Sequence, residues 1–227
     1  MAAPRTFPQR PFTLMPGATE LLLVRHGASA DAVEGRSFPT VDGQGDPPLS
    51  ELGHEQAGLV CARLRAQPVD AVYVTTLQRT VQTIQPFVDA TGMTPFIESK
   101  LREVHLGDWE GGLLRQKVFD RDPIAVRMLA EQRWELIPGA ESSGEFAARV
   151  RAGIDAIASA HVGRRVVIVT HGGTIGEALR QVTNSNPFAF VGADNGSFSS
   201  IVVVGPISTL RCFNDISHLL VTSAEMT

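Results

Sequence analysis

Side chains that could bind or attack an anion stand directly after three short apolar runs of the sequence. An Arg-His-Gly motif occupies residues 25–27, the stretch 75–80 contains Arg79, and a His-Gly-Gly motif occupies residues 171–173. In an open parallel sheet, ligands bind beyond the carboxyl ends of the strands. A lone histidine at a strand end is more often structural than catalytic, but three coincident sites favour a shared function. We therefore expect two histidines and two arginines to meet at one edge of a sheet.

Arg79 and the glycines after His171 point to an anionic ligand. If Thr76 caps the predicted helix, Arg79 lies in its first turn, where a cation opposes the helix dipole. That cost is tolerable if the side chain holds an anion, and the alternative is an arginine that extends into solvent. Gly172 and Gly173 open another predicted helix, whose free N–H groups suit a phosphate or carboxylate. Phosphate is the anion that these features favour.

Five short apolar runs predict the strands that position these residues, at 20–24, 69–74, 94–97, 166–169 and 201–204. Helical spacing of apolar residues predicts helices over 52–64, 77–88, 146–157 and 175–182. Pro86 predicts a kink in the second helix, and Ser142 with Glu145 forms a capping box before the third. Strands that alternate with helices predict an α/β fold with a mostly parallel sheet.

Length and composition fit one large domain. The chain has 227 residues, of which 43% are hydrophobic and 19% charged, with a formal net charge of −4. This charge argues against nucleic-acid or anionic-membrane partners, and no apolar run approaches the ~20 residues of a membrane-spanning helix. We expect a flexible extension over residues 1–19, one domain over residues 20–220, and a cytoplasmic location with both cysteines reduced.

An ordered set of motifs over roughly residues 21–204 resembles the histidine phosphatase superfamily, also called phosphoglycerate mutase-like. The motifs are LVRHG at 23–27, LSELGHEQA at 49–57, LQRTVQT at 77–83, LREVHLGDWEG at 101–111 and VTHGG at 169–173. Any one of them is modest evidence, whereas the ordered set is specific. The resemblance implies a three-layer α/β/α sandwich around the sheet, and a catalytic domain of this family over residues 20–220.

The same resemblance implies roles for individual residues. His26 would be the catalytic nucleophile that takes the phosphoryl group, Glu103 the proton donor, and His171 a catalytic residue that binds the phosphoryl oxygens. The rest of the predicted phosphate site is Arg25, Arg79, Ser29 and Gly172. The family needs no metal, so no metal or other cofactor is expected. One departure is Ala32, because many family members have an asparagine there that helps to hold phosphate.

The implied reaction is hydrolysis of a phosphate monoester through a phosphohistidine, with a small phosphorylated metabolite as substrate. The alternative is phosphoglycerate mutase-type transfer between two positions of a sugar acid. Glycolytic mutases carry a longer insertion after the acid residue that covers the site. Here about 38 residues separate Glu103 from Glu141, which favours the phosphatase.

Two further classes of protein fit the sequence less well. A metal-dependent hydrolase built on His26, His105 and His171 would need clustered ligands, and no His-x-x-x-His spacing occurs. A non-catalytic phosphate-binding protein would not need the complete set of histidines, arginines and Glu103. The loop 32–48 and the segment 113–137 are expected to frame the leaving group without selecting one metabolite. The sequence leaves the oligomeric state open, although enzymes of this kind are often homodimers.

Overall fold

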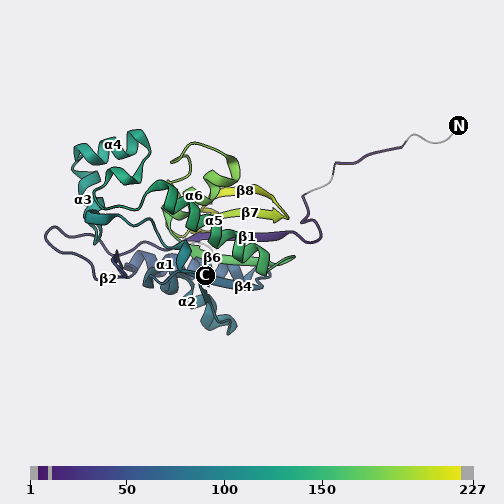
Figure 1. Cartoon of the computed structure of the whole chain (residues 1–227). Helices are drawn as coiled ribbons and strands as arrows, with labels where there is room; N and C mark the ends of the chain where they lie inside the picture. Colours follow the sequence, from purple (N-terminus) through teal and green to yellow (C-terminus); the bar gives the residue numbers. More distant parts are fainter. Residues whose placement is uncertain (1–4, 10–11, 221–227) are drawn as a thin grey trace.

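The computed structural model of the protein describes residues 5–9 and 12–220. Its main sheet has six strands in the order β5-β4-β6-β1-β7-β8 (Figure 1). The pairs β5–β4, β4–β6 and β6–β1 are parallel, whereas β1–β7 and β7–β8 are antiparallel. The predicted α/β fold with a mostly parallel sheet is confirmed.

The predicted strands are all present, and the structure adds three. The strands are β1 Thr19–Arg25, β2 Thr40–Val41, β3 Gln44–Gly45, β4 Ala71–Val74, β5 Phe96–Ile97, β6 Arg165–Thr170, β7 Phe198–Val204 and β8 Ile207–Asp215. β2 and β3 form a short hairpin within the loop 32–48. β8 escapes prediction because its residues alternate between exposed and half-buried positions and form no continuous apolar run.

The four predicted helices correspond to α1, α2, α5 and α6. The helices are α1 Glu51–Arg65, α2 Gln78–Thr91, α3 Leu113–Phe119, α4 Pro123–Glu131, α5 Ser143–Ala160 and α6 Gly172–Thr183, with 3-10 turns η1 Ser99–Leu101, η2 Gly107–Trp109, η3 Trp134–Leu136 and η4 Ser217–Leu219. The capping box of Ser142 and Glu145 at the start of α5 is confirmed. Pro86 lies inside α2, and the kink expected there stays a prediction.

The expected cap of α2 is wrong. The residue before the helix is Leu77, which offers no side-chain cap, and the Thr76 hydroxyl is buried without a partner among the described residues. Instead, an Asp46 carboxylate oxygen accepts from the Gln78 N–H at 2.8 Å. The cap of α2 is therefore a side chain from a distant loop. The Asp46 carboxylate satisfies one of the N–H groups in the first turn that have no partner within the helix.

Alternate side chains of the buried strands pack into two apolar cores, one on each face of the sheet. On β1, Leu21 and Leu23 belong to the core that contains residues of α5 and α6, whereas Leu22 and Val24 belong to the core that contains residues of α1 and α2. This period of two is the geometry of an extended strand. Helices therefore flank both faces, as the α/β/α sandwich requires.

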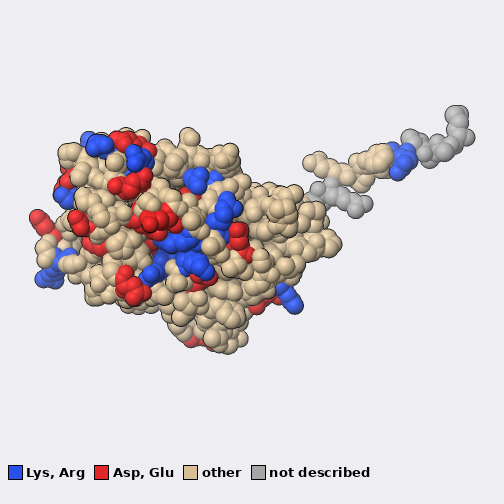
Figure 2. Space-filling model, viewed as in Figure 1, with Lys and Arg blue, Asp and Glu red and all other residues tan. Residues whose placement is uncertain are grey.

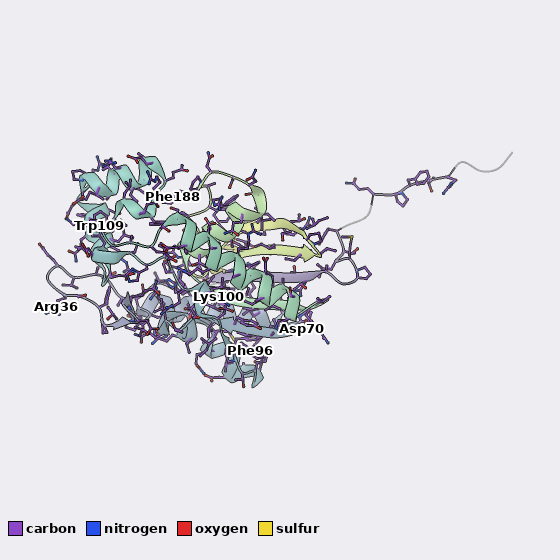
Figure 3. The ribbon with its side chains drawn as sticks, in the orientation of Figure 1. Arg36, Asp70, Phe96, Lys100, Trp109 and Phe188 are labelled. Carbon is purple, nitrogen blue, oxygen red and sulfur yellow. The ribbon has the colours of Figure 1, made fainter. Side chains whose placement is uncertain are left out.

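The start of β4 and the carboxyl ends of the parallel strands lie at opposite ends of the molecule. Asp70, which precedes β4, lies at one end of the molecule, while Arg36 and Trp109 lie toward the other, where β1, β4 and β6 terminate (Figure 3). On the face shown in Figure 2, acidic and basic side chains are interspersed. Among the described residues, no helix is long and apolar enough to cross a membrane.

The predicted extension over residues 1–19 falls partly outside the described residues. Residues 5–9 and 12–18 form no helix or strand, and β1 begins at Thr19. The flexibility of the extension and the domain boundary at residue 220 stay predictions, as do the cytoplasmic location and the homodimer. Cys61 is buried, Cys212 is half-buried, and neither forms a disulfide.

Candidate active site

Three parallel strands bring charged and imidazole side chains to one edge of the sheet. β1 ends at Arg25 and leads into His26, β6 leads into His171, and α2 begins after β4 with Arg79 in its first turn. The ring centroids of His26 and His171 lie 5.2 Å apart. The Arg79 Nε–H donates to His26 Nε2 at 3.2 Å. The structure therefore brings together the groups that the strand-end argument expects to meet.

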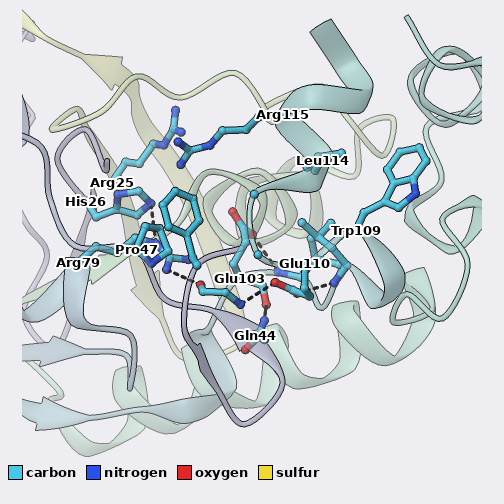
Figure 4. A pocket seen from close by; sticks show the side chains of 16 residues that line it. Arg25, His26, Gln44, Pro47, Arg79, Glu103, Trp109, Glu110, Leu114 and Arg115 are labelled. Atoms are coloured by element: carbon cyan, nitrogen blue, oxygen red, sulfur yellow. Dashed lines mark hydrogen bonds between the residues drawn. The ribbon is translucent and has the colours of Figure 1, made fainter. Parts of the chain in front are cut away.

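A pocket of about 260 Å³ opens at this edge (Figure 4). Four of the predicted site residues line it: Arg25, His26, Arg79 and Glu103. His171 is fully buried and packs edge-on against the His26 ring, so it does not line the pocket. Ser29 and Gly172 also lie outside the lining, although a Cβ at Gly172 would sit 3.4 Å from Arg25 Nε.

The surroundings of His26 decide which ring nitrogen can act as a nucleophile. Its Nδ1 lies 2.7 Å from the Gly27 carbonyl oxygen, and because a carbonyl only accepts, Nδ1 carries the proton. Nε2 keeps its lone pair and receives the Arg79 N–H. Burial, together with the charges of Arg79 and Arg25, holds the pKa of His26 well below its usual value. The ring is thus neutral, and its electron pair on Nε2 accepts from Arg79 at the pocket.

His171 offers a donor rather than a nucleophile. Its Nε2 lies 3.0 Å from Thr75 Oγ1, and its Nδ1 is buried without a hydrogen-bond partner among the described residues. Burial, followed by the charge of Arg79, holds the pKa of His171 well below its usual value. If the Thr75 hydroxyl donates to Nε2, the proton of the neutral ring is on Nδ1. That N–H can donate to an oxygen of a bound anion.

Both arginines are oriented by backbone carbonyls. Arg25 donates to the Ala193 carbonyl, and Arg79 donates to the Gly45 carbonyl at 3.0 Å. Burial lowers the pKa of both guanidinium groups, which nevertheless stay charged. Arg25 Nε is buried without a partner among the described residues. Fixed cations with an unused donor favour a bound anion, since charge-assisted hydrogen bonds are the stronger kind.

Glu103 enters the pocket from the segment between η1 and η2. Its carboxylate accepts from the backbone N–H groups of Val104 and Gly173, each at 3.0 Å. The threonine hydroxyls at positions 170 and 174 donate to the carbonyls of residues 101 and 102, at 2.7 and 2.8 Å. The end of β6 and the start of α6 therefore hold Glu103 at the pocket that His26 also lines.

Arg149 of α5 also holds the segment around Glu103 through hydrogen bonds. Its guanidinium donates to the carbonyls of residues 100, 102 and 103 at 2.7, 2.7 and 2.8 Å. It also forms a bidentate ion pair with Glu141, at 2.7 and 2.8 Å. The Glu103 carbonyl accepts a further hydrogen bond from Gln44 Nε2 at 2.6 Å. Glu141 thus orients Arg149 and does not line the pocket.

Glu110 links the β2–β3 hairpin to the turn around residue 106. One carboxylate oxygen accepts from the Gly45 N–H at 2.7 Å, and the other accepts from the Leu106 N–H at 2.8 Å. Because the Gly45 carbonyl holds Arg79, Glu110 supports the orientation of that guanidinium. Its carboxylate is occupied by backbone donors, which is the pattern of a positioning residue.

The two segments predicted to frame the leaving group supply six further lining residues: Phe38, Gln44, Gly45, Pro47, Leu114 and Arg115. The first four lie in the loop 32–48, and the hairpin within it turns them toward the site. The other two belong to α3, which has only seven residues and no clear apolar period. The length of the loop indicated its functional role, whereas no motif singled out these six residues individually. Trp109 lies across the pocket from His26 (Figure 4).

The histidines of the metal-hydrolase alternative do not form a ligand set. His105 Nδ1 accepts from the Gly107 N–H at 3.1 Å and so shapes the turn that follows Glu103. Within residues 5–9 and 12–220, no group of three or more His, Cys, Asp or Glu side chains is arranged to hold a metal ion.

Comparison with known proteins identifies a family and two kinds of named relative. The family model of the histidine phosphatase superfamily (branch 1) matches residues 21–216. A protein of Yersinia enterocolitica named "Probable phosphoglycerate mutase GpmB" is 29% identical over 170 residues, which cover 75% of this chain and 77% of the relative.

Solved structures match over most of the chain. The mycobacterial glucosyl-3-phosphoglycerate phosphatase, solved in complex with VO3, is 27% identical with a TM-score of 0.71, covering 86% of this chain and 98% of that one. Bacillus stearothermophilus YhfR is 28% identical with a TM-score of 0.75, covering 88% and 99%. The names of these similar proteins therefore include both a mutase and a phosphatase.

Proposed function

Because the chain belongs to the histidine phosphatase superfamily, we propose that it hydrolyses the phosphate monoester of a small metabolite through a phosphohistidine on His26. The observation that carries this proposal is the state of the His26 ring. Nδ1 is committed to the Gly27 carbonyl, so the electron pair of the neutral ring is on Nε2, where it accepts from the Arg79 N–H at the pocket. Such a nitrogen can attack phosphorus and divide one difficult displacement into two easier ones.

In the first step, the Nε2 electron pair forms a bond to phosphorus and the bond from phosphorus to the ester oxygen breaks. Glu103 gives its proton to the departing oxygen, which leaves as an alcohol. The transferring group carries its charge on its equatorial oxygens, so catalysis depends on positioning and on cations. Arg25, Arg79 and the Nδ1–H of His171 supply the donors around those oxygens.

In the second step, water attacks the phosphorus of the phosphohistidine. The Glu103 carboxylate takes a proton from that water, the phosphorus–nitrogen bond breaks, and its electron pair returns to Nε2. Inorganic phosphate leaves, while His26 is neutral and Glu103 protonated as at the start. One carboxyl group thus serves as acid and then as base, which is why its exact placement by Gly173 and Arg149 matters.

Phosphoryl transfer between positions of a sugar acid is the alternative function. The name of one relative, a probable phosphoglycerate mutase, supports this alternative. A mutase must protect its phosphohistidine from water, and the segment between Glu103 and Glu141 provides only the short helices α3 and α4 and the turns η2 and η3. The two reactions separate in one assay, because a mutase depends on a bisphosphorylated primer whereas a hydrolase releases inorganic phosphate from the monoester alone.

A panel of phosphate monoesters tests the proposed function. We expect primer-independent release of inorganic phosphate from at least one member of the panel, unaffected by a metal chelator. No turnover across sugar, acid and aryl phosphates would contradict the proposal. Release that requires a bisphosphorylated primer would favour the mutase instead.

A glycine variant tests whether the position of Glu103 limits turnover. A Cβ at Gly173 would lie 2.4 Å from Glu103 Oε1, so Gly173→Ala must displace the carboxyl group. We expect kcat/KM to fall by about 10²-fold, since misplacement by an ångström costs that much. The matched control is Gly58→Ala in α1, where a Cβ meets nothing within 4 Å; it should keep full activity and gain about 0.5–1 kcal/mol of stability. Steady-state kinetics and thermal denaturation measure both effects, and an active Gly173→Ala would contradict the assignment.

A further inference from the structure

Arg115 of α3 reaches the pocket from outside the predicted site. It lines the pocket together with Arg25, and Figure 4 shows both guanidinium groups among the side chains around this pocket. Burial is the main cause that lowers the pKa of Arg25, His26 and Arg79, and the charge of Arg115 lowers each of these values further. The guanidinium of Arg115 is therefore close enough to act on the groups that surround the phosphoryl position.

The Arg115 guanidinium is fixed in place without a carboxylate partner. It donates to Ser29 Oγ at 2.7 Å and to the Ala30 carbonyl at 2.9 Å, which leaves three of its five N–H donors unused. No acidic side chain among the described residues forms an ion pair with it. By contrast, Lys117 on the same helix pairs with Asp122. Burial lowers the pKa of Arg115, and the charge of Asp31 raises it without forming an ion pair. An oriented cation with unused donors favours an anionic ligand.

The approach of α3 depends on small residues. A Cβ at Gly112, the residue before α3, would lie 3.1 Å from the Cβ of Ala32. A side chain at position 112 would also lie 3.0 Å from the Phe38 ring, and the φ of +103° there is a conformation that favours glycine. Ala32 and Gly112 therefore allow the helix to lie over the loop at 29–32, and Arg115 to reach across it.

We propose that Arg115 is a further catalytic residue, a third guanidinium that binds the transferring phosphoryl group next to Arg25. The inference rests on the proposed function, since it concerns the same phosphoryl group. Ser29 and the Ala30 carbonyl orient Arg115, so the predicted phosphate contact of Ser29 is made through this arginine. Three guanidinium groups then surround a group whose negative charge spreads over its equatorial oxygens during transfer.

Inhibition by orthovanadate tests the inference without any choice of substrate. Vanadate has no leaving group, and in its trigonal-bipyramidal form it resembles the transition state. We expect Arg115→Met to raise the inhibition constant for vanadate by about 10- to 100-fold, the range that a hydrogen bond to a charged group supplies. The control is Arg127→Met, which removes an exposed arginine paired with Glu131 on α4 and should leave the constant unchanged.

Two further variants separate phosphoryl binding from a bracing role. Ser29→Ala removes one hydrogen-bond partner of Arg115 but leaves the charge of Arg115 in place. We therefore expect a smaller increase in the inhibition constant for vanadate than in Arg115→Met. Arg115→Lys keeps one charge but cannot reach loop and phosphoryl oxygens together, and we expect about a tenfold increase. This variant also carries the test if thermal denaturation shows that Arg115→Met is unfolded.

The outcomes are distinct. An unchanged vanadate constant in Arg115→Met and Arg115→Lys, with a raised KM for a phosphate monoester, would place Arg115 on the leaving group and overturn the inference. An equal increase in Ser29→Ala and Arg115→Met would reduce Arg115 to a brace and would also overturn it. If the unaltered protein neither binds vanadate nor hydrolyses any monoester, the proposed function itself fails.

Discussion

Replacement of His26 by alanine is expected to abolish turnover of every phosphate monoester, whatever its leaving group. The Nε2 electron pair is the only nucleophile in the proposed first step, and alanine offers no substitute. We expect kcat to fall by at least about 10⁴-fold, the scale seen when a covalent nucleophile is removed. Steady-state kinetics on an alkyl and an aryl phosphate measure the loss. His54→Ala, which removes an exposed histidine of α1, is the matched control and should retain full activity.

The same assignment predicts where a trapped phosphoryl group will be found. Brief incubation with substrate labelled in the phosphoryl group, followed by an alkaline quench and peptide mapping, should place the label on His26. A phosphoramidate survives alkali and is lost in acid, whereas a phosphoserine behaves in the opposite way. Label on a serine, or no label during turnover under single-turnover conditions, would contradict the mechanism.

Glu103→Gln is expected to separate substrates by the basicity of their leaving groups. Glutamine keeps the shape but has a single acceptor oxygen, so it retains only one of the hydrogen bonds from the Val104 and Gly173 N–H groups, and it cannot deliver an acidic proton. General acid catalysis is worth about 10²–10⁴-fold, and an alkyl phosphate, which would otherwise leave as an alkoxide, should lose that much. A nitrophenyl phosphate leaves as a stabilised phenolate and should lose far less.

Single-turnover measurement of phosphoenzyme formation isolates the step in which the proton is delivered. Glu55→Gln on the exposed side of α1 is the control and should behave like the unaltered protein on both substrates. Equal losses on both substrates in Glu103→Gln would remove Glu103 as the acid. The neighbouring carboxylates are poor replacements, because Glu110 is held by two backbone N–H groups and Glu141 by Arg149.

The parts of the site that were predictable follow from rules that act locally along the chain. The apolar runs marked the central strands, and the residues after them had to lie at one edge because parallel strands share their carboxyl ends. His26, Arg79 and His171 could therefore be placed near one another before any contact was known. The roles of these residues stay predictions, because geometry alone does not measure catalysis.

Other parts depend on contacts that leave no local pattern. The cap of α2 comes from Asp46, more than thirty positions upstream, and Arg149 reaches the carbonyls beside Glu103 from a separate helix. Arg115 sits on a seven-residue helix that begins after Gly112, where a Cβ would crowd Phe38 and Ala32 of a distant loop. Such tertiary contacts are fixed by packing between distant elements, and the sequence around each residue carries no signal for them.

The central position of β1 has a consequence for how the chain reaches its active state. β1 is first in sequence, yet its partners are β6 and β7, more than 140 residues later. During synthesis, the apolar stretch Leu21–Val24 has no strand to pair with until those residues emerge from the ribosome. Contacts of such long sequence separation form slowly, and an unpaired apolar strand is prone to aggregation. Recovery of activity after unfolding should therefore follow the closure of β1 against β6, and β1 is the segment that a chaperone would protect during synthesis.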